Sequence, residues 1–197
     1  MQLQKTGKLF LLASPSGGGK TTLANALIER VGSLYDLSRV ITYTTRQPRS
    51  HERHGIDYHF ITQADFQAKI EQQFFLEWSA AYGCHYGTPG DIITSVEAGR
   101  SYIAVVDRAG VRSISQAYQK SVAIWIEVSS PAVLEERLKK RASESPEQLK
   151  RRLLLAQQEL AEEQFCNIYK YRLINDELGR AIKALQDIII GEITAGI

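Results

Sequence analysis

The sequence predicts an α/β protein in which helices cover both faces of a parallel sheet. Two observations lead to this fold class: short apolar runs recur along the chain, and helical patterns separate them. Four runs are apolar enough to form buried strands, namely KLFLLA (8–13), SYIAVV (101–106), VAIWIEV (122–128) and YRLI (171–174). Continuous apolar runs of this length are typical of parallel strands, which are buried on both faces.

The other core elements follow from the same pattern. RVIT (39–42) is a weaker candidate for a fifth strand, and helical patterns occupy 20–31, 90–98, 109–118, 131–140, 147–163 and 179–190. Pro131 after Ser130 favours a helix start, because proline is well tolerated at the first helical position. Strands that alternate with helices predict right-handed crossover connections around one sheet.

Two stretches interrupt the alternation. Residues 43–89 contain the strand-like pieces DYHFI and FLEWSAAY and a helical pattern at 64–72, so we expect a small mixed α+β insertion. The core would then comprise 1–42 and 90–197, with the whole chain forming a single unit. Residues 138–150 (LKKRASESPEQLK) have the composition of a mobile lid, although a solvated surface loop has the same composition.

Composition and charge are those of one ordinary globular domain. The chain has 197 residues, of which 44% are hydrophobic and 23% charged. A net charge of +2 and a pI of about 8.5 do not indicate nucleic acid or a membrane as a partner. The apolar run near the N-terminus is too short for a signal peptide or a membrane span. Cys84 and Cys166 lack CxxC spacing, so we expect free thiols and a cytoplasmic protein.

A glycine-rich stretch, SPSGGGKTT (14–22), lies between the first strand and the first helical pattern. This strand–loop–helix context is what the phosphate-loop motif G-x-x-x-x-G-K-[ST] requires. Glycines allow the backbone N–H groups to turn around an anion, and the helix N-terminus adds partial positive charge. The sequence therefore predicts a P-loop NTPase-type core with a nucleotide phosphate site made by Ser16, Gly17, Gly18, Gly19, Lys20, Thr21 and Thr22.

Individual residues of this loop have separate expected roles. Lys20 can reach the β- and γ-phosphates, and the Thr21 hydroxyl can bind Mg²⁺. Ser14 stands where the motif has its first glycine. Because Ser14 lies at the junction of strand and loop, before the phosphate cradle, we expect the serine to be tolerated at a modest cost.

Four motifs follow in the insertion: TYTTRQPR (42–49), GIDYHF (55–60), FLEW (75–78) and YGTP (86–89). In this order, after a phosphate loop, they resemble the guanylate kinase family of P-loop nucleoside monophosphate kinases. The resemblance covers nearly the whole chain. It implies phosphate transfer from ATP to GMP, a step in purine nucleotide metabolism.

Cationic and hydroxyl groups of these motifs suit a phosphate. Arg46 and Arg49 are three residues apart and can converge on one phosphate, a task that fits the planar guanidinium. Tyr58 and Tyr86 can add hydroxyl donors. The resemblance implies that these four residues bind the phosphate of GMP; the alternative is exposed arginines and core tyrosines.

Glu77 lies between Leu76 and Trp78, where it could also be the exposed position of a strand. The resemblance makes it the residue that recognises guanine. A carboxylate accepts from N1–H and the exocyclic amine of guanine, whereas adenine presents an acceptor at N1. A site of this kind can discriminate by ~10⁴ or more. Thr42 and Thr88 match the hydroxyl-bearing base contacts of the family.

Asp107 follows an apolar strand, at the sheet edge where ligands of α/β proteins bind. It could orient Mg²⁺ through water or contact guanine. The chain departs from the family here: a second acid is usual at the position of Val105, and a bulky residue and glutamine are usual at those of Arg108 and Ala109.

Arginines near the expected lid could neutralise charge in the transition state. Arg137 and Arg141 are four residues apart, on one face of a helix, and Arg152 follows the lid. They match the catalytic arginines of the family, although a solvated helix face would look the same. The family usually has glycine where this chain has Ala142, and Asn175 resembles a residue on the adenine side of the nucleotide site.

The expected reaction is direct in-line transfer, because no covalent nucleophile stands out. ATP is the donor, Mg²⁺ the cofactor, and GMP or dGMP the acceptor. A family-like binding module for an acidic partner, or a kinase for another phosphorylated acceptor such as a sugar phosphate, are the alternatives. The retained Lys20 and Thr21 argue against the first, and Glu77 argues against the second. The oligomeric state is undecided, and a homo-oligomer stays open.

Overall fold

In the computed structural model, residues 7–50, 52–81, 83–140, 146–163 and 166–195 are described. The larger of two sheets has five strands in the order β2-β7-β1-β8-β9, and every neighbouring pair is parallel. Its strands are β1 (Leu9–Ala13), β2 (Leu37–Arg39), β7 (Ser101–Val105), β8 (Val122–Glu127) and β9 (Tyr171–Ile174). The parallel core predicted from the apolar runs is therefore confirmed.

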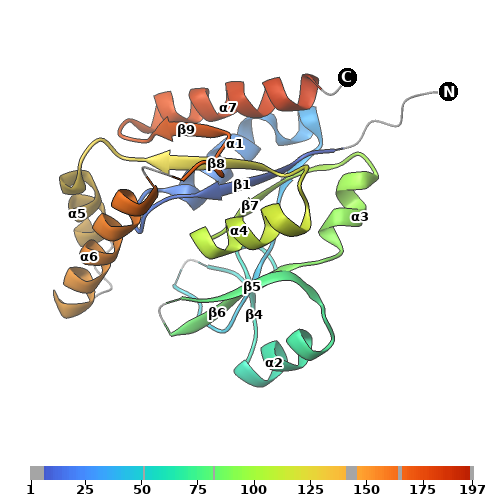
Figure 1. Ribbon diagram of the computed structural model, residues 1–197, viewed down its shortest axis with the longest axis horizontal. Helices are drawn as coiled ribbons and strands as arrows, with labels where there is room; N and C mark the ends of the chain where they lie inside the picture. Colours follow the sequence, from blue (N-terminus) through green and yellow to red (C-terminus); the bar gives the residue numbers. More distant parts are fainter. Residues whose placement is uncertain (1–6, 51, 82, 141–145, 164–165, 196–197) are drawn as a thin grey trace.

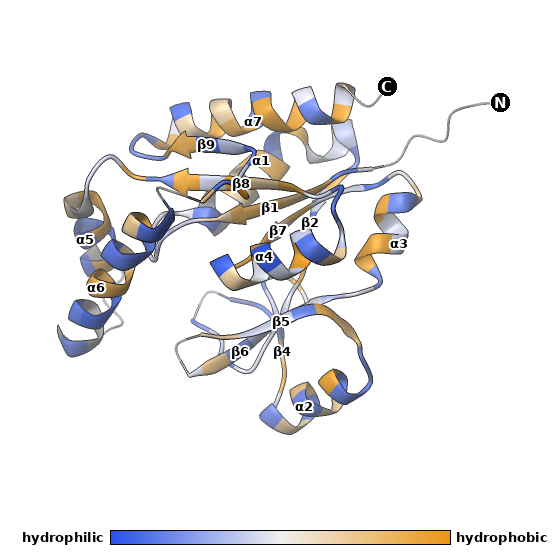
Figure 2. Ribbon diagram, in the orientation of Figure 1, coloured by the Kyte–Doolittle hydropathy of each residue, from blue (hydrophilic) through white to orange (hydrophobic). Residues whose placement is uncertain are grey.

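Helices cover both faces of this sheet, because its strands are apolar on both sides (Figures 1 and 2). Phe10 and Leu12 of β1 pack with α1 (Lys20–Tyr35) and α7 (Leu178–Thr194). Leu9 and Leu11 of the same strand pack with α3 (Ile92–Glu97) and α4 (Arg108–Ala117). All of β1 is buried, as the continuous apolar run predicts.

The expected strand RVIT (39–42) is misplaced. The observed edge strand β2 ends at Arg39, and Val40 lies beyond it, although the Val40 N–H still donates to the Ile103 carbonyl at 2.9 Å. Residues 40–42 carry the chain from the larger sheet to the smaller one, where β3 begins at Tyr43. The run is apolar because Val40 is buried at this crossing.

A second, mixed sheet of four strands contains the motifs of the insertion and lies below the larger sheet in Figure 1. Its order is β4-β3-β6-β5, with β3 parallel to β4 and antiparallel to β6. The elements are β3 (Tyr43–Thr44), β4 (His59–Phe60), α2 (Gln63–Glu71), β5 (Phe75–Ala81) and β6 (Cys84–Pro89). Phe66 of α2 is fully buried and stacks on Phe75 of β5, with ring centroids 4.6 Å apart.

Helices α5 (Pro131–Lys140) and α6 (Pro146–Glu163) lie together at the end of the larger sheet to which β8 points (Figure 1). Leu134 and Ala156 pack between them. The expected lid, 138–150, spans the end of α5 and the start of α6, and its residues 141–145 lie outside the described part of the chain.

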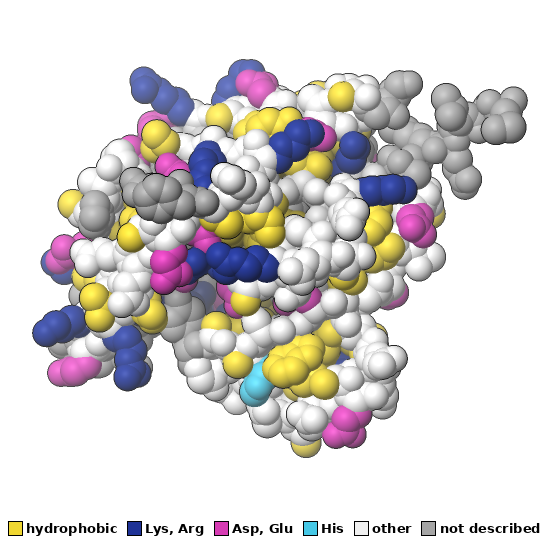
Figure 3. Space-filling model, in the orientation of Figure 1, with side chains coloured by type: hydrophobic (Ala, Val, Ile, Leu, Met, Phe, Trp, Pro, Cys, Tyr) yellow, Lys and Arg dark blue, Asp and Glu magenta, His cyan; other side chains and the backbone are white. Residues whose placement is uncertain are grey.

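The helices and one face of the molecule bear on possible membrane or nucleic-acid partners. Among the described helices, none has the length and apolar character needed to cross a bilayer. Figure 3 shows basic and acidic side chains interspersed over one face, in keeping with the mild net charge. Cys84 and Cys166 are free and half-buried.

Candidate active site

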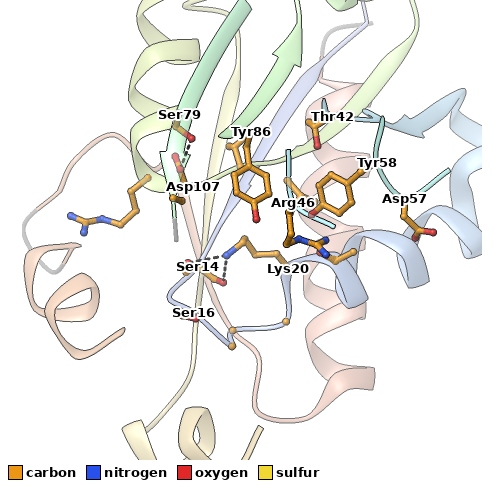
Figure 4. A pocket seen from close by; sticks show the side chains of 18 of the residues that line it. Ser14, Ser16, Lys20, Thr42, Arg46, Asp57, Tyr58, Ser79, Tyr86 and Asp107 are labelled. Atoms are coloured by element: carbon orange, nitrogen blue, oxygen red, sulfur yellow. Dashed lines mark hydrogen bonds between the residues drawn. The ribbon is translucent and has the colours of Figure 1, made fainter. Parts of the chain in front are cut away.

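A cleft of about 900 Å³ lies between the glycine loop and the smaller sheet. Most of the residues that the sequence singled out line it: Ser16, Gly17, Gly18, Gly19, Lys20, Thr21, Thr22, Thr42, Arg46, Arg49, Tyr58, Glu77, Tyr86, Asp107 and Arg152. Three others, Thr88, Arg137 and Asn175, are not among its lining residues, and Arg141 lies outside the described residues. Residues from distant parts of the chain thus meet in one site (Figure 4).

The glycine loop begins where β1 ends and leads directly into α1 at Lys20. Gly17 and Gly19 have φ angles of 87° and 88°, which side-chain-bearing residues rarely adopt. Gly19 is the N-cap of α1, so the positive end of the helix faces the loop. The backbone geometry therefore suits an anion, as the motif predicts.

Ser14 fits into the loop against Gly18. A Cβ on Gly18 would come within 2.5 Å of Ser14 Oγ, so glycine is needed at 18 because serine occupies 14. The Ser14 hydroxyl donates to the Pro15 carbonyl at 2.8 Å, and Lys20 Nζ donates to both the carbonyl and the Oγ of Ser14 at 3.1 Å. Ser14, which replaces the first glycine of the motif, is thus buried, and its hydroxyl both donates and accepts a hydrogen bond within the loop.

Asn175 supports the loop from the side of β9. Its Nδ2 donates to the Gly18 carbonyl at 2.8 Å, and a Cβ on Gly19 would lie 2.5 Å from that nitrogen. Arg137 in turn donates through Nη2 to the carbonyls of Asn175 and Asp176, at 2.6 and 3.2 Å. Asn175, predicted on the adenine side, therefore contacts the loop directly, and Arg137, predicted as a catalytic arginine, contacts the backbone at Asn175.

Two of the residues predicted to bind the acceptor phosphate, Arg46 and Arg49, contact the carboxylate of Glu52. Arg46 donates to both oxygens of Glu52 at 2.9 Å, and Arg49 donates to Glu52 through its backbone N–H at 2.8 Å. Burial acts to raise the pKa of Glu52, but these hydrogen bonds outweigh it and hold the pKa below its ordinary value. Tyr58 and Tyr86 lie beside Arg46 in Figure 4, with their rings 6.3 Å apart.

Glu77 is buried, at 8% exposure, so it is not an exposed strand position. The Thr88 hydroxyl donates to Glu77 Oε1 at 2.7 Å across the β5–β6 pair, and Thr88 is fully buried behind it. Burial raises the pKa of Glu77 to about 7; the charge of Asp107 adds to this, and the Thr88 hydrogen bond opposes it. The cleft thus contains a partly desolvated carboxylate.

Asp107 connects α4 to the smaller sheet. One oxygen caps α4 by accepting from the Gly110 N–H at 2.7 Å, and the other accepts from the Ser79 hydroxyl at 2.7 Å (Figure 4). Gly110 is also close to the predicted guanine contact, because a Cβ there would lie 3.1 Å from Glu77 Oε2. Asp107 and Glu77 therefore share one wall of the cleft.

Helix α6 reaches the glycine loop with two residues. Arg152 Nε donates to Ser16 Oγ at 3.0 Å, and the Ser16 backbone N–H donates to Glu159 Oε2 at 3.2 Å. Of the three predicted arginines, Arg152 forms a hydrogen bond with the phosphate loop in the described part of the chain.

Arg108, a departure from the family pattern, connects α4 to the end of α6. It forms ion pairs with Glu162, at 2.6 Å, and with Glu163, which is fully buried. Arg112 adds a second pair to Glu163 at 3.1 Å. The arginine at position 108 is thus matched by acidic residues on α6, the helix that also carries Arg152 and Glu159.

The cleft also contains polar residues that were not predicted from the sequence, among them Glu52, Ser79 and Glu159. Two of them follow periods that could have been noticed. Ser79 is two residues after Glu77 and lies on the same side of β5, and Glu159 is two helical turns after Arg152. Glu52 gave no such signal, because its contacts with Arg46 and Arg49 depend on tertiary structure.

The donor set of the cleft fits Mg²⁺ bound through a nucleotide. No three His, Cys, Asp or Glu side chains cluster as metal ligands within the described ranges. Mg²⁺ at nucleotide sites needs only one or two protein ligands, since phosphates and water supply the rest. Thr21 and Asp107 both line the cleft and offer oxygen atoms of that kind.

Comparisons with known proteins identify chains that are similar over nearly the whole length of this one. The family model described as Guanylate kinase matches residues 6–192. A guanylate kinase of Nitrosospira multiformis is 40% identical over 94% of this chain and 86% of its own length, and one of Myxococcus xanthus is 37% identical over 94% and 87%. The crystal structure of guanylate kinase from Anaplasma phagocytophilum superposes with a TM-score of 0.77 at 25% identity, covering 96% of this chain and 87% of that one.

Proposed function

The chain belongs to the guanylate kinase family and transfers phosphate from ATP to GMP, and we propose here which residues carry out each part of that transfer. The observation that supports the assignment is the shared cleft. It has the glycine loop with Lys20 on one wall and the Arg46, Tyr58 and Tyr86 cluster with Glu77 on another.

The glycine loop is proposed to bind the donor. Its backbone N–H groups and the N-terminus of α1 hold the phosphates of ATP, and Lys20 neutralises their charge. Lys20 is held by Ser14, which keeps its ammonium at the mouth of the loop. Asn175 maintains the loop conformation through the Gly18 carbonyl, in addition to its predicted place on the adenine side.

The smaller sheet is proposed to bind the acceptor. Arg46 and Arg49 bind the phosphate of GMP with Tyr58 and Tyr86, and Glu52 pre-orients the two guanidinium groups. Glu77 accepts from the Watson–Crick edge of guanine, and Thr88 fixes the orientation of its carboxylate. The acceptor unit would comprise 43–89, with dGMP accepted as well as GMP.

Mg²⁺ bound with ATP would neutralise the charge that develops on the transferred phosphate. Thr21 would supply a protein oxygen, and Asp107 would act through water, because both of its carboxylate oxygens already accept hydrogen bonds. Arg152 adds positive charge from α6, with Arg137 and Arg141 proposed to join it when the lid closes.

A coupled assay of ADP formation with GMP, dGMP, AMP, UMP and CMP tests the acceptor. We expect turnover with the guanine nucleotides, in the range of about 1–100 s⁻¹ usual for kinases. Lys20→Ala should lower kcat by at least about a hundredfold, as loss of an electrostatic stabiliser does, while Lys183→Ala on the exposed face of α7 should not. Equal turnover with AMP would contradict the guanine assignment.

A further inference from the structure

Ser16 is held by two residues of opposite charge on α6. Arg152 and Glu159 are seven residues apart, which places them two turns apart on one helix face. One donates to the Ser16 hydroxyl at 3.0 Å, and the other accepts from the Ser16 backbone N–H at 3.2 Å. Ser16 is buried, and all three residues line the cleft.

Glu159 presents its carboxylate to this loop. Burial and, to a lesser extent, the charge of Asp107 raise the pKa of Glu159, and the Ser16 N–H and the positive charges of Lys20 and Arg108 oppose this shift without reversing it. Backbone donors and the lysine of a phosphate loop are the groups that hold nucleotide phosphates. The carboxylate of Glu159 therefore interacts with groups that the donor nucleotide also needs.

We propose that Glu159 competes with the phosphates of ATP for the glycine loop, so that donor binding displaces its carboxylate from Ser16. The inference rests on the donor site proposed above. Two anions cannot share the Ser16 N–H, and they repel each other across the loop. Arg152 has the opposite preference, because its charge is attracted to the same phosphates.

This competition gives α6 two contacts with the loop that respond differently to the donor. Glu159 keeps the helix docked on the phosphate loop before ATP binds, and Arg152 keeps it docked afterwards. The helix would stay close to the loop in both situations, with the arginine already positioned beside the transferred phosphate.

Calorimetric titration with ATP in Mg²⁺ buffer tests the proposal on the full chain. Glu159→Gln removes the negative charge but still accepts from the Ser16 N–H. We expect about tenfold tighter ATP binding, a change of about 1.4 kcal/mol, because ATP then displaces a weaker, neutral hydrogen bond and no carboxylate repels its phosphates. Adenosine should bind equally to both proteins. Glu162→Gln removes one charge from the same helix without contacting the loop, and it should leave ATP affinity unchanged.

Glu159→Ala and GMP turnover complete the test. If Glu159 competes with phosphate, alanine also tightens ATP binding, and the KM for ATP falls while that for GMP stays constant. If Glu159 only stabilises the loop, both variants bind ATP more weakly, and the proposal is wrong. Unchanged ATP affinity in both variants would also overturn it. Unchanged ATP affinity together with normal GMP turnover would overturn the role of Glu159 but not the proposed donor site. Absence of GMP turnover in the unmodified enzyme would instead contradict the proposed function.

Discussion

The Thr88 hydroxyl donates to Glu77 Oε1 at 2.7 Å, from a fully buried position behind a carboxylate that is itself only 8% exposed. A buried carboxylate with one bound oxygen is oriented, and its other lone pairs face the cleft. This arrangement suits recognition of two adjacent N–H groups at the edge of a purine.

Glu77→Gln should therefore weaken recognition of guanine. The amide oxygen can still accept from Thr88, but the amide nitrogen presents hydrogens where guanine also presents hydrogens. We expect the KM for GMP to rise and the ratio of kcat/KM for GMP over AMP to fall by about a hundredfold or more. Steady-state assays with both acceptors measure the ratio, and Glu71→Gln on the exposed side of α2 is the control. An unchanged ratio would remove Glu77 from the guanine site.

The raised pKa of Glu77 predicts a pH dependence of stability. In the folded protein its pKa is about 7, above the ordinary value of 4.5, so the folded state binds more protons between these values. The free energy of unfolding therefore decreases as pH rises from about 4.5 to 7, by roughly 2–3 kcal/mol from this group. Glu77→Gln has no such term.

Urea unfolding at pH 5 and pH 8 measures this effect. The difference in unfolding free energy between Glu77→Gln and the unmodified protein should shift in favour of the glutamine variant at pH 8. Comparing the two proteins cancels the titration of all other groups. A difference that is constant with pH would mean that Glu77 titrates at an ordinary pKa.

Local patterns predicted the larger sheet and the glycine loop, because both depend on residues close in sequence. The apolar runs give strands wherever the chain is buried on both faces, and KLFLLA and YRLI fall within one residue of β1 and β9. RVIT was misplaced because burial at the crossing between two sheets gives the same apolar pattern as a strand.

The sequence alone could not predict which side chains of different helices and strands contact one another. Arg137 is near the lid, as expected, but it is turned to the carbonyls at the end of β9, an element 34 residues further along the chain. Glu159 is one of several acidic residues on α6, and only the packing of that helix selects it as the partner of Ser16. The spacing of Arg152 and Glu159 places both on one helix face, but only tertiary packing determines that this face meets the glycine loop.

Ser14 and Gly18 form a coupled pair. We expect Gly18→Ala to destabilise the protein by about 1–3 kcal/mol, because its Cβ would clash with Ser14 Oγ and Cβ at 2.5 and 2.7 Å. Ser14→Gly in the same chain should restore part of this loss, and alone it should leave GMP kinase activity within severalfold. Thermal unfolding of the single and double variants measures the coupling. Strictly additive effects would show that the two side chains do not limit each other.

Arg108 is expected to stabilise the contact between α4 and α6. Arg108→Ala leaves Glu163 fully buried with Arg112 as its remaining cation, and Arg112 is half-exposed. Loss of one partner of a buried ion pair typically costs 3–5 kcal/mol, so we expect about 2–3 kcal/mol here because Arg112 compensates in part.

Denaturant unfolding of Arg108→Ala measures that loss, with Lys183→Ala as the matched control. Lys183 forms an exposed pair with Asp187, and its removal should cost less than about 0.5 kcal/mol. Adding Glu163→Gln to Arg108→Ala should recover stability, since the uncompensated buried charge is removed. If the double variant is no more stable than Arg108→Ala, the loss comes from packing of the arginine side chain, and the buried charge of Glu163 is not its cause.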